Sequence, residues 1–322
     1  MRTVPYFAAA LVAALTIGGS APEASAQTYP SKPVTLIIPY PPGGFVDGLG
    51  RVIAKQFGTR TGGTMIVESR PGRDGIVGSY AAARAAPDGY TLLLGDSNPL
   101  TVAPLMHATL PYDSMADFTR IATITSSNPI MIARVESSLK SIADVVDAAK
   151  ARPGKLTYGS GTIGQQLMIE MLKVRANVSM LHVPYKGGSQ VITDLLGGHV
   201  DLAATASANY INLRTKVVAL AIASEARFKH LPEVPTMVEL GYPGFMMGAW
   251  LGILGPRGLP PELVSFLTPL IGEIVNSSEF GDFAQRAGNQ VVFLTGDEFE
   301  RRMIADRETL GPLVKAAGLK AE

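Results

Sequence analysis

Short apolar segments, each followed by a Gly- or Ser-rich turn and then a stretch with helical periodicity, recur along most of this chain. In the first such unit, the apolar residues 34–39 lead through Pro41-Pro42-Gly43-Gly44 into a helical pattern over residues 46–57. Further strands are predicted at residues 65–68, 90–94, 130–133, 156–158, 180–183, 200–204 and 217–223. Nearly continuous apolar strands that alternate with helices predict an α/β fold with mainly parallel sheets flanked by helices.

The length of 322 residues predicts two domains, because single cores rarely grow beyond about 250 residues. An apolar share of 47% against 17% charged residues is enough for large cores and argues against a disordered chain. Composition shifts near residues 126–129 and 246–248 indicate where the chain crosses between domains. We therefore assign residues 27–127 plus 250–322 to the first domain and residues 128–249 to the second. The strand-poor tail, residues 261–317, is expected to pack back onto the first domain.

The N-terminus has the features of a secretory signal peptide over residues 1–26. Arg2 precedes an apolar run over residues 7–18, and Ala24-Ser25-Ala26 ends the segment. The run is too short to span a bilayer, which needs about 20 apolar residues. We expect a protein that is exported, cleaved after residue 26 and located in the bacterial periplasm.

The charge balance and the absent residue types narrow the function further. Lys and Arg number 28 against 27 Asp and Glu, and a net charge of +1 argues against a nucleic-acid partner. The sequence has no cysteine, which excludes thiolate nucleophiles and Cys-ligated metals. Its four histidines lie far apart and show no H-x-x-x-H spacing. The sequence therefore predicts neither a metal nor a cofactor.

Three polar turns that follow predicted strands are candidate anion sites. In the first, Gly43 and Gly44 stand between a strand and a helix, so free backbone N–H groups and the helix dipole favour an anion without Lys or Arg. The second turn spans residues 158–164, and the third is Asp96-Ser97-Asn98. In doubly wound sheets, ligands bind beyond the carboxyl ends of the strands, where all three turns fall. For the two glycines, a purely structural role in a tight turn stays equally open.

Ser97 is also a candidate nucleophile, because Gly95-Asp96-Ser97-Asn98 after a strand resembles the first block of GDS-type serine esterases. Such an enzyme needs a histidine base that is oriented by a carboxylate. The sequence contains no D-x-x-H and no G-x-S-x-G, and its last histidine is His230. The residues therefore argue against catalysis and for a binding protein.

Ordered stretches over nearly the whole mature chain match one known family. They are YPSKPVTLI (29–37), PPGGFVD (41–47), ESRPG (68–72), PDGYTLL (87–93), LPYDSMADF (110–118), KARPGKLTY (150–158), HVPYKG (182–187), TDLLGGHVDL (193–202), LPEVPTMVEL (231–240) and AWLGILGP (249–256). On these stretches the sequence resembles the substrate-binding receptors of tripartite tricarboxylate transporters, also called Bug proteins. The resemblance implies a two-domain periplasmic binding protein, in which two crossing strands join the domains and the cleft between them closes on the ligand like a hinged trap.

The resemblance also implies which residues bind the ligand. One ligand carboxylate is expected at the first glycine loop, with further contacts from both domains. The implied binding residues are Tyr40, Gly43, Gly44, Phe45, Asp47, Ser97, Asn98, Ser160, Thr162, Thr205 and Ser207. We expect Asp47 to order the loop rather than to touch the carboxylate, because two anions in contact would repel each other.

Two of these places depart from the family's pattern. Gln165-Gln166-Leu167 stands where Ser and His are expected, in a shortened second-domain loop, and Thr205-Ala206-Ser207 replaces an Asp-Asn pair. Both departures fall in the part that reads the distal end of the ligand, so the choice between an aliphatic and an aromatic ligand stays open. Met246 and Met247 are expected to pack in a core or in a wall of the cleft.

The sequence thus predicts an exported, monomeric solute receptor that binds a small organic carboxylate and presents it to the membrane subunits of a tripartite transporter. No nucleic acid, metal or cofactor is expected to take part. Two alternatives remain at this point: a ligand-sensing partner of a sensor kinase, and a GDS-type esterase that uses Ser97.

Overall fold

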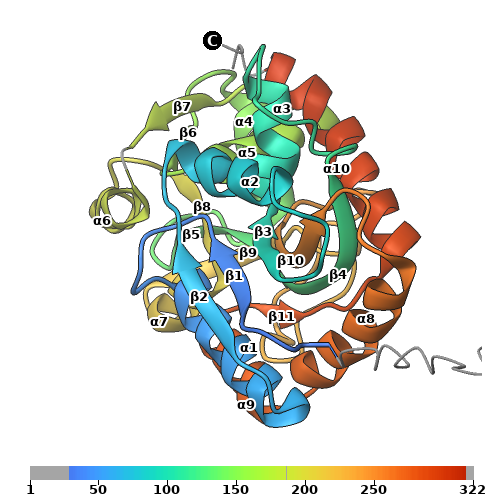
Figure 1. Cartoon of the computed structure of the whole chain (residues 1–322). Helices are drawn as coiled ribbons and strands as arrows, with labels where there is room; N and C mark the ends of the chain where they lie inside the picture. Colours follow the sequence, from blue (N-terminus) through green and yellow to red (C-terminus); the bar gives the residue numbers. More distant parts are fainter. Residues whose placement is uncertain (1–28, 186, 317–322) are drawn as a thin grey trace, which may run out of the picture.

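The computed structural model describes residues 29–185 and 187–316, which form two mixed β-sheets flanked by helices (Figure 1). The first sheet contains β1 (Val34–Ile38), β2 (Met65–Ser69), β3 (Thr91–Asp96), β4 (Phe118–Ser127), β10 (Ala249–Pro256) and β11 (Gln290–Val291). The second contains β5 (Pro129–Arg134), β6 (Thr157–Ser160), β7 (Leu181–Pro184), β8 (Leu202–Ala206) and β9 (Val217–Ile222). Their orders are β11-β4-β10-β3-β1-β2 and β7-β6-β8-β5-β9. The predicted signal peptide lies outside the described residues.

The predicted strand–turn–helix units are present in both sheets. β1 pairs in parallel with β2 and β3, and β6 pairs in parallel with β7 and β8. Six helices belong to these units: α1 (Phe45–Thr61), α2 (Ile76–Ala83), α4 (Ile142–Ala151), α5 (Ile163–Ala176), α6 (Gly188–Gly197) and α7 (Ser207–Leu213). Leu36, Ile38 and Leu49 are fully buried in one cluster, so the apolar pattern of the first unit builds the core beneath it.

The residue pattern itself predicted no strand at β4 or β10, and each sheet is mixed because β10 in the first and β5 in the second run against their neighbours. β10 runs antiparallel to both β3 and β4, and β5 runs antiparallel to both β8 and β9. β4 contains Arg120 and Thr123, while β10 contains Gly252 and Gly255, so neither shows an unbroken β-branched apolar run. β5 brings the chain into the second sheet and β10 returns it to the first, and each enters its sheet against the direction of the neighbouring strands.

The chain passes from the first sheet to the second at Asn128, between β4 and β5. Its side-chain amide donates to the carbonyl of Ala223 at 2.6 Å and to that of Met247 at 2.9 Å, both on the segment that returns to the first sheet. A Cβ on Gly248 would lie 2.6 Å from Asn128 Nδ2, so only glycine allows this close approach. The outgoing and returning segments therefore form one packed junction. The division of the chain into two domains at these segments stays a prediction.

The C-terminal part is helical and consists mainly of α8 (Pro261–Val275), α9 (Ser278–Arg286) and α10 (Gly296–Ala316). α8 and α9 pack against α1 and the first sheet. α10 begins on that sheet with Phe299 and Met303 buried, but its end packs on α5, where Leu313 and Val314 join the core of the second sheet (Figure 1). The tail thus packs on the first sheet and, through the end of α10, on the second sheet as well.

The junction yields a stability prediction for Asn128→Ala. The change removes one side-chain donor from two buried carbonyls, of which that of Ala223 keeps the N–H of Met247, so we expect the unfolding free energy to fall by about 1–3 kcal/mol in urea denaturation. The matched control is Asn209→Ala, which removes an amide from an exposed residue and should change stability by less than about 0.5 kcal/mol. Equal losses in the two variants would show that the junction contributes nothing particular to stability.

Candidate functional site

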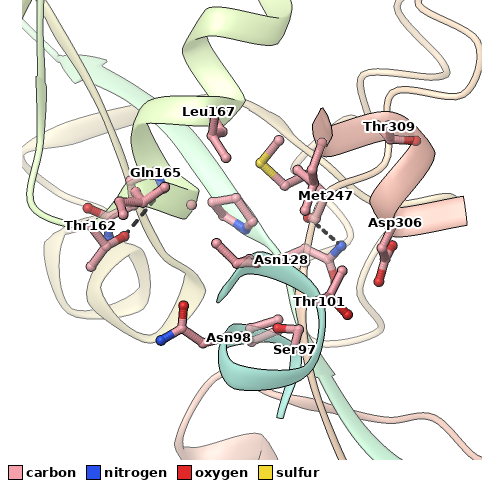
Figure 2. Close-up of a pocket in the computed structure, with 18 of the residues that line it drawn as sticks. Ser97, Asn98, Thr101, Asn128, Thr162, Gln165, Leu167, Met247, Asp306 and Thr309 are labelled. Carbon is pink, nitrogen blue, oxygen red and sulfur yellow. Dashed lines mark hydrogen bonds between the residues drawn. The ribbon is translucent and has the colours of Figure 1, made fainter. Parts of the chain in front are cut away.

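A cavity of about 520 Å³ lies between the two sheets, beside the junction at Asn128 (Figure 2). Its polar side chains come from both sheets and from α10: Asp74, Ser97, Asn98, Thr101, Ser127, Asn128, Thr162, Gln165, Asp306 and Thr309. The residues that line it, all from the described part of the chain, include no Lys, Arg or His. An anion in this cavity must therefore be held by neutral donors.

The turn after β3 brings Ser97 and Asn98 to the cavity, where their part in binding stays a prediction. From there the chain continues as a short π-helix, η2 (Asn98–Val102). The N–H of Asn98 donates to Asp96 Oδ1 at 2.6 Å. Burial raises the pKa of the Asp96 carboxyl to about 6, against opposing hydrogen bonds from Tyr40 and the Asn98 N–H. The Asn98 N–H, at the start of η2, is thus already paired with a carboxyl group of the protein.

The N-terminus of α5 opens onto the cavity. Thr162 caps this helix, because its hydroxyl accepts the N–H of Gln165 at 3.3 Å, while Gln165 Oε1 accepts the N–H of Gly161 at 3.0 Å. Ile163 and Gly164 also line the cavity, and among the described residues no acceptor is found for their N–H groups. Two unpaired N–H groups at the positive end of a 14-residue helix favour a carboxylate at this point.

The first glycine loop does not line the cavity in this structure. Gly43 and Gly44 are exposed, and the Gly43 N–H donates to Asp47 Oδ2 at 3.0 Å. Asp47 is buried and also accepts two hydrogen bonds from Arg51, at 3.0 and 3.2 Å. The bonds from Arg51 and then from Gly43 lower the pKa of Asp47 below its usual value. Asp47 thus anchors the loop and accepts a hydrogen bond from one of its N–H groups.

The two aromatic residues predicted near this loop also lie outside the cavity lining. Phe45 stacks on Phe283 of α9, with ring centroids 5.9 Å apart. Burial, and next the charge of Asp96, raise the pKa of the half-buried Tyr40 above its ordinary value, so its hydroxyl stays protonated. A ligand role for either residue stays a prediction.

Ser160 ends β6 and is held by a network within the second sheet. Its Oγ lies 2.7 Å from His182 Nε2, and the ring of His182 stacks on that of Tyr158, 4.9 Å between centroids. The Tyr158 hydroxyl donates to the buried carboxylate of Glu170. Burial lowers the pKa of His182, so the neutral ring is favoured. Ser160 is buried in this structure, and its contact with a ligand stays a prediction.

Thr205 and Ser207 are buried on either side of Ala206, the residue of this turn that lines the cavity. The Thr205 hydroxyl accepts a hydrogen bond from Asn209 at 3.0 Å, and the Ser207 hydroxyl donates to the carbonyl of Gly288. Both hydroxyls therefore have protein partners in this structure. Their roles in binding stay predictions.

α10 supplies a wall of the cavity that the sequence analysis missed. Asp306 accepts the Trp250 indole N–H at 3.1 Å and Arg302 Nε at 2.8 Å, and burial raises the pKa of its carboxyl. Thr309 and Leu310 line the cavity one turn later. The i, i+3, i+4 spacing of these residues marks one helix face, but the pattern alone does not tell which face meets a ligand.

The structure also shows where the remaining residues that the sequence singled out lie relative to the cavity. Met246 and Met247 line the cavity, as a cleft wall requires. Ser97 lies in the cavity, but none of the residues that line it is a histidine base. Within the described residues, no group of three or more His, Cys, Asp or Glu side chains is placed to hold a metal. Nor does any helix in this part of the chain have the length and apolar character needed to cross a membrane.

Comparisons with known proteins agree on one family. Residues 49–319 match the profile of the "Tripartite tricarboxylate transporter family receptor". The chain is 33% identical to protein BugT of Bordetella pertussis over 316 residues, covering 95% of each chain. A TctC solute-binding protein from Polaromonas, solved without ligand, superimposes with a TM-score of 0.82 at 29% identity, covering 90% of this chain and 100% of that one. An R. palustris protein with adipate gives 0.72 at 26% identity, covering 91% and 100%.

The buried carboxyl of Asp96 makes a stability prediction that depends on pH. Because its folded pKa of about 6 lies above its unfolded value, the group's stabilising contribution is complete below pH ~4 and is lost as the pH rises through about 6. Asp96→Asn removes the ionisation, so the variant should be more stable than wild type by about 2–3 kcal/mol at pH 7. Urea denaturation at pH 7 and at pH 4 should show that the difference in unfolding free energy between the variant and wild type disappears near pH 4. The same difference at both pH values would contradict the raised pKa of Asp96.

Proposed function

The chain belongs to the tripartite tricarboxylate transporter receptor family, a family of binding proteins rather than enzymes, and from that membership we propose that it captures a small organic carboxylate. The capture takes place in the periplasm, and the loaded receptor is then presented to the membrane subunits of a tripartite transporter. The observation that carries this proposal is the N-terminus of α5, which opens onto a cavity between the sheets. The adipate held by the R. palustris relative supports the same ligand class.

The α5 N-terminus suits a carboxylate for physical reasons. The N–H groups of Ile163 and Gly164 provide two donors at the end of the helix that carries partial positive charge. Hydroxyl and amide groups on the opposite side of the gap, at Ser97 and Asn98, provide further neutral donors. A bound carboxylate would therefore contact elements of both sheets and favour the closed arrangement over the open one.

Two comparisons support an open arrangement in this structure. The superposition is better on the ligand-free Polaromonas protein, at a TM-score of 0.82, than on the adipate complex, at 0.72, although coverage is nearly the same. In keeping with an open cleft, several of the expected binding residues, such as Gly43 and Ser160, do not line the cavity. Rotation about the junction at Asn128 would bring the first-sheet loop and the α5 N-terminus closer together.

Titration calorimetry of the mature protein tests the proposed function. The panel contains aliphatic and aromatic carboxylates, each paired with its neutral amide, at neutral pH. We expect at least one acid to bind while its amide binds far more weakly, because the α5 N-terminus favours a negative charge. Binding of amides but of no acid would refute the proposal.

Ile163→Pro tests which donors hold the carboxylate. Proline at the first helical position removes one N–H and is tolerated, since Thr162 before it is extended at φ −145° and ψ 158°. We expect affinity for the acid found in the panel to fall about tenfold or more, the range for a lost hydrogen bond to a charged group. Ile163→Ala is the control, because it shortens the same side chain and keeps the N–H. Equal affinities for the two variants would place the carboxylate elsewhere.

Asp47→Ala tests the tie between Asp47 and the glycine loop. The change releases the Gly43 N–H and frees the loop, so we expect ligand affinity to fall several-fold without loss of the folded state. Arg51→Met is the control, since it removes the exposed ion-pair partner and leaves the Gly43 bond in place. Calorimetry should give near wild-type affinity for the control, and wild-type affinity for Asp47→Ala would reject the role.

A further inference from the structure

The cavity has one end that suits an anion and an opposite end that does not. Thr162 and Gln165, at the start of α5, lie on one side, and Asp306 and Thr309 of α10 lie on the other (Figure 2). The first end offers unpaired N–H groups and the positive end of a helix dipole. The second end offers a carboxyl group and a hydroxyl. A ligand that spans the cavity therefore meets opposite electrostatic conditions at its two ends.

Asp306 forms an ion pair with Arg302, and as a carboxylate it has no proton to donate to a second ligand carboxylate. Its own oxygens already accept hydrogen bonds from Trp250 and Arg302, and its side chain is 15% exposed. Arg302, the cation beside it, is not among the residues that line the cavity, and its Nε is already used by Asp306. A second carboxylate here would lose its hydration and face a carboxyl group without gaining an ion-pair partner.

The space between the two ends is mostly apolar. It is lined by Val102, Pro129, Leu167, Met246, Met247 and Leu310. In the close-up, Leu167 and Met247 lie between the α5 end and the α10 end (Figure 2). Methionine side chains adapt to ligands of different outline and contact aromatic rings favourably. This wall gains free energy by covering a hydrocarbon or aromatic body, and it offers nothing to additional charged groups.

We propose that the ligand is a monocarboxylate with a compact aliphatic or aromatic body, and that Asp306 is the residue that excludes a second carboxylate. The proposal rests on the proposed function, since it places the single carboxylate at the α5 N-terminus. It goes further because it states which ligand group lies at the α10 end of the cavity, a question that the sequence left open.

Paired acids that differ by one carboxylate test this proposal in calorimetry at neutral pH. Hexanoate is compared with adipate, and benzoate with terephthalate, using the wild-type mature protein. We expect the monocarboxylate of at least one pair to bind at least tenfold more tightly than its dicarboxylate. A dicarboxylate that binds, with no tenfold preference for the monocarboxylate in either pair, would overturn the proposal while leaving the proposed function intact. Absence of binding by every acid in these pairs and in the wider panel would refute both.

Thr309→Lys turns the test into a gain of function at the far end. A cation there should raise the affinity for adipate at least fivefold relative to the affinity for hexanoate, because only adipate has a second carboxylate to reach it. Ala305→Lys adds the same charge at an exposed residue of α10 outside the lining and is the control. An equal gain in both variants, or none in Thr309→Lys, would overturn the assignment of the far end.

Asp306→Asn is the complementary variant. It keeps the shape of the side chain while removing its charge. The ratio of the affinity for hexanoate to the affinity for adipate should fall by at least threefold. Its thermal melting curve shows whether the bonds to Trp250 and Arg302 still support the fold. An unchanged preference in a folded variant would show that Asp306 does not set it.

Discussion

The site depends on the close packing of two chain segments at the junction between the sheets. Asn128 donates its amide to carbonyls at Ala223 and Met247, and Gly248 lets the outgoing and returning segments approach closely. Asn128 itself lines the cavity, so the group that joins the sheets also borders the space between them. Backbone carbonyls buried at such a point need a donor, because there is little water to supply one. This amide, together with the backbone bond from the Ala223 N–H to the Pro129 carbonyl, joins the outgoing and returning segments beside the cavity.

The described lining of the cavity offers an anion backbone N–H groups and neutral side chains rather than basic ones, so which N–H groups are already paired matters. On the first sheet, two N–H groups that could attract an anion are already paired with protein carboxyls: that of Gly43 with Asp47, and that of Asn98 with Asp96. On the second sheet, the N–H groups of Ile163 and Gly164 at the start of α5 have no acceptor among the described residues. The net charge of +1 fits this arrangement, since a receptor that uses helix dipoles needs no basic surplus.

The sequence was most informative where one local pattern determines one element. The apolar strand, turn and helix of the first unit correspond to β1 and α1, because the same spacing that makes Leu36 and Leu49 apolar buries them. It was least informative where tertiary contacts decide. β10 has glycines where a strand pattern needs branched residues, and its strand form depends on pairing with β3 and β4. Asp306 reaches the cavity only because α10 crosses between the sheets, which no helical periodicity reveals.

That crossing links ligand contact to movement of the sheets. The first half of α10 is buried against the first sheet through Phe299 and Met303, and its last turns are buried against the second through Leu313 and Val314. The closure proposed above would move these two anchors relative to each other and would require the helix to deform between them. Pro312 lies within this helix and lacks the N–H that would bond one turn back, which makes the last turns easier to bend. Asp306 and Thr309 stand on the stretch between the anchors, so a ligand that contacts them touches the part of α10 on which closure acts.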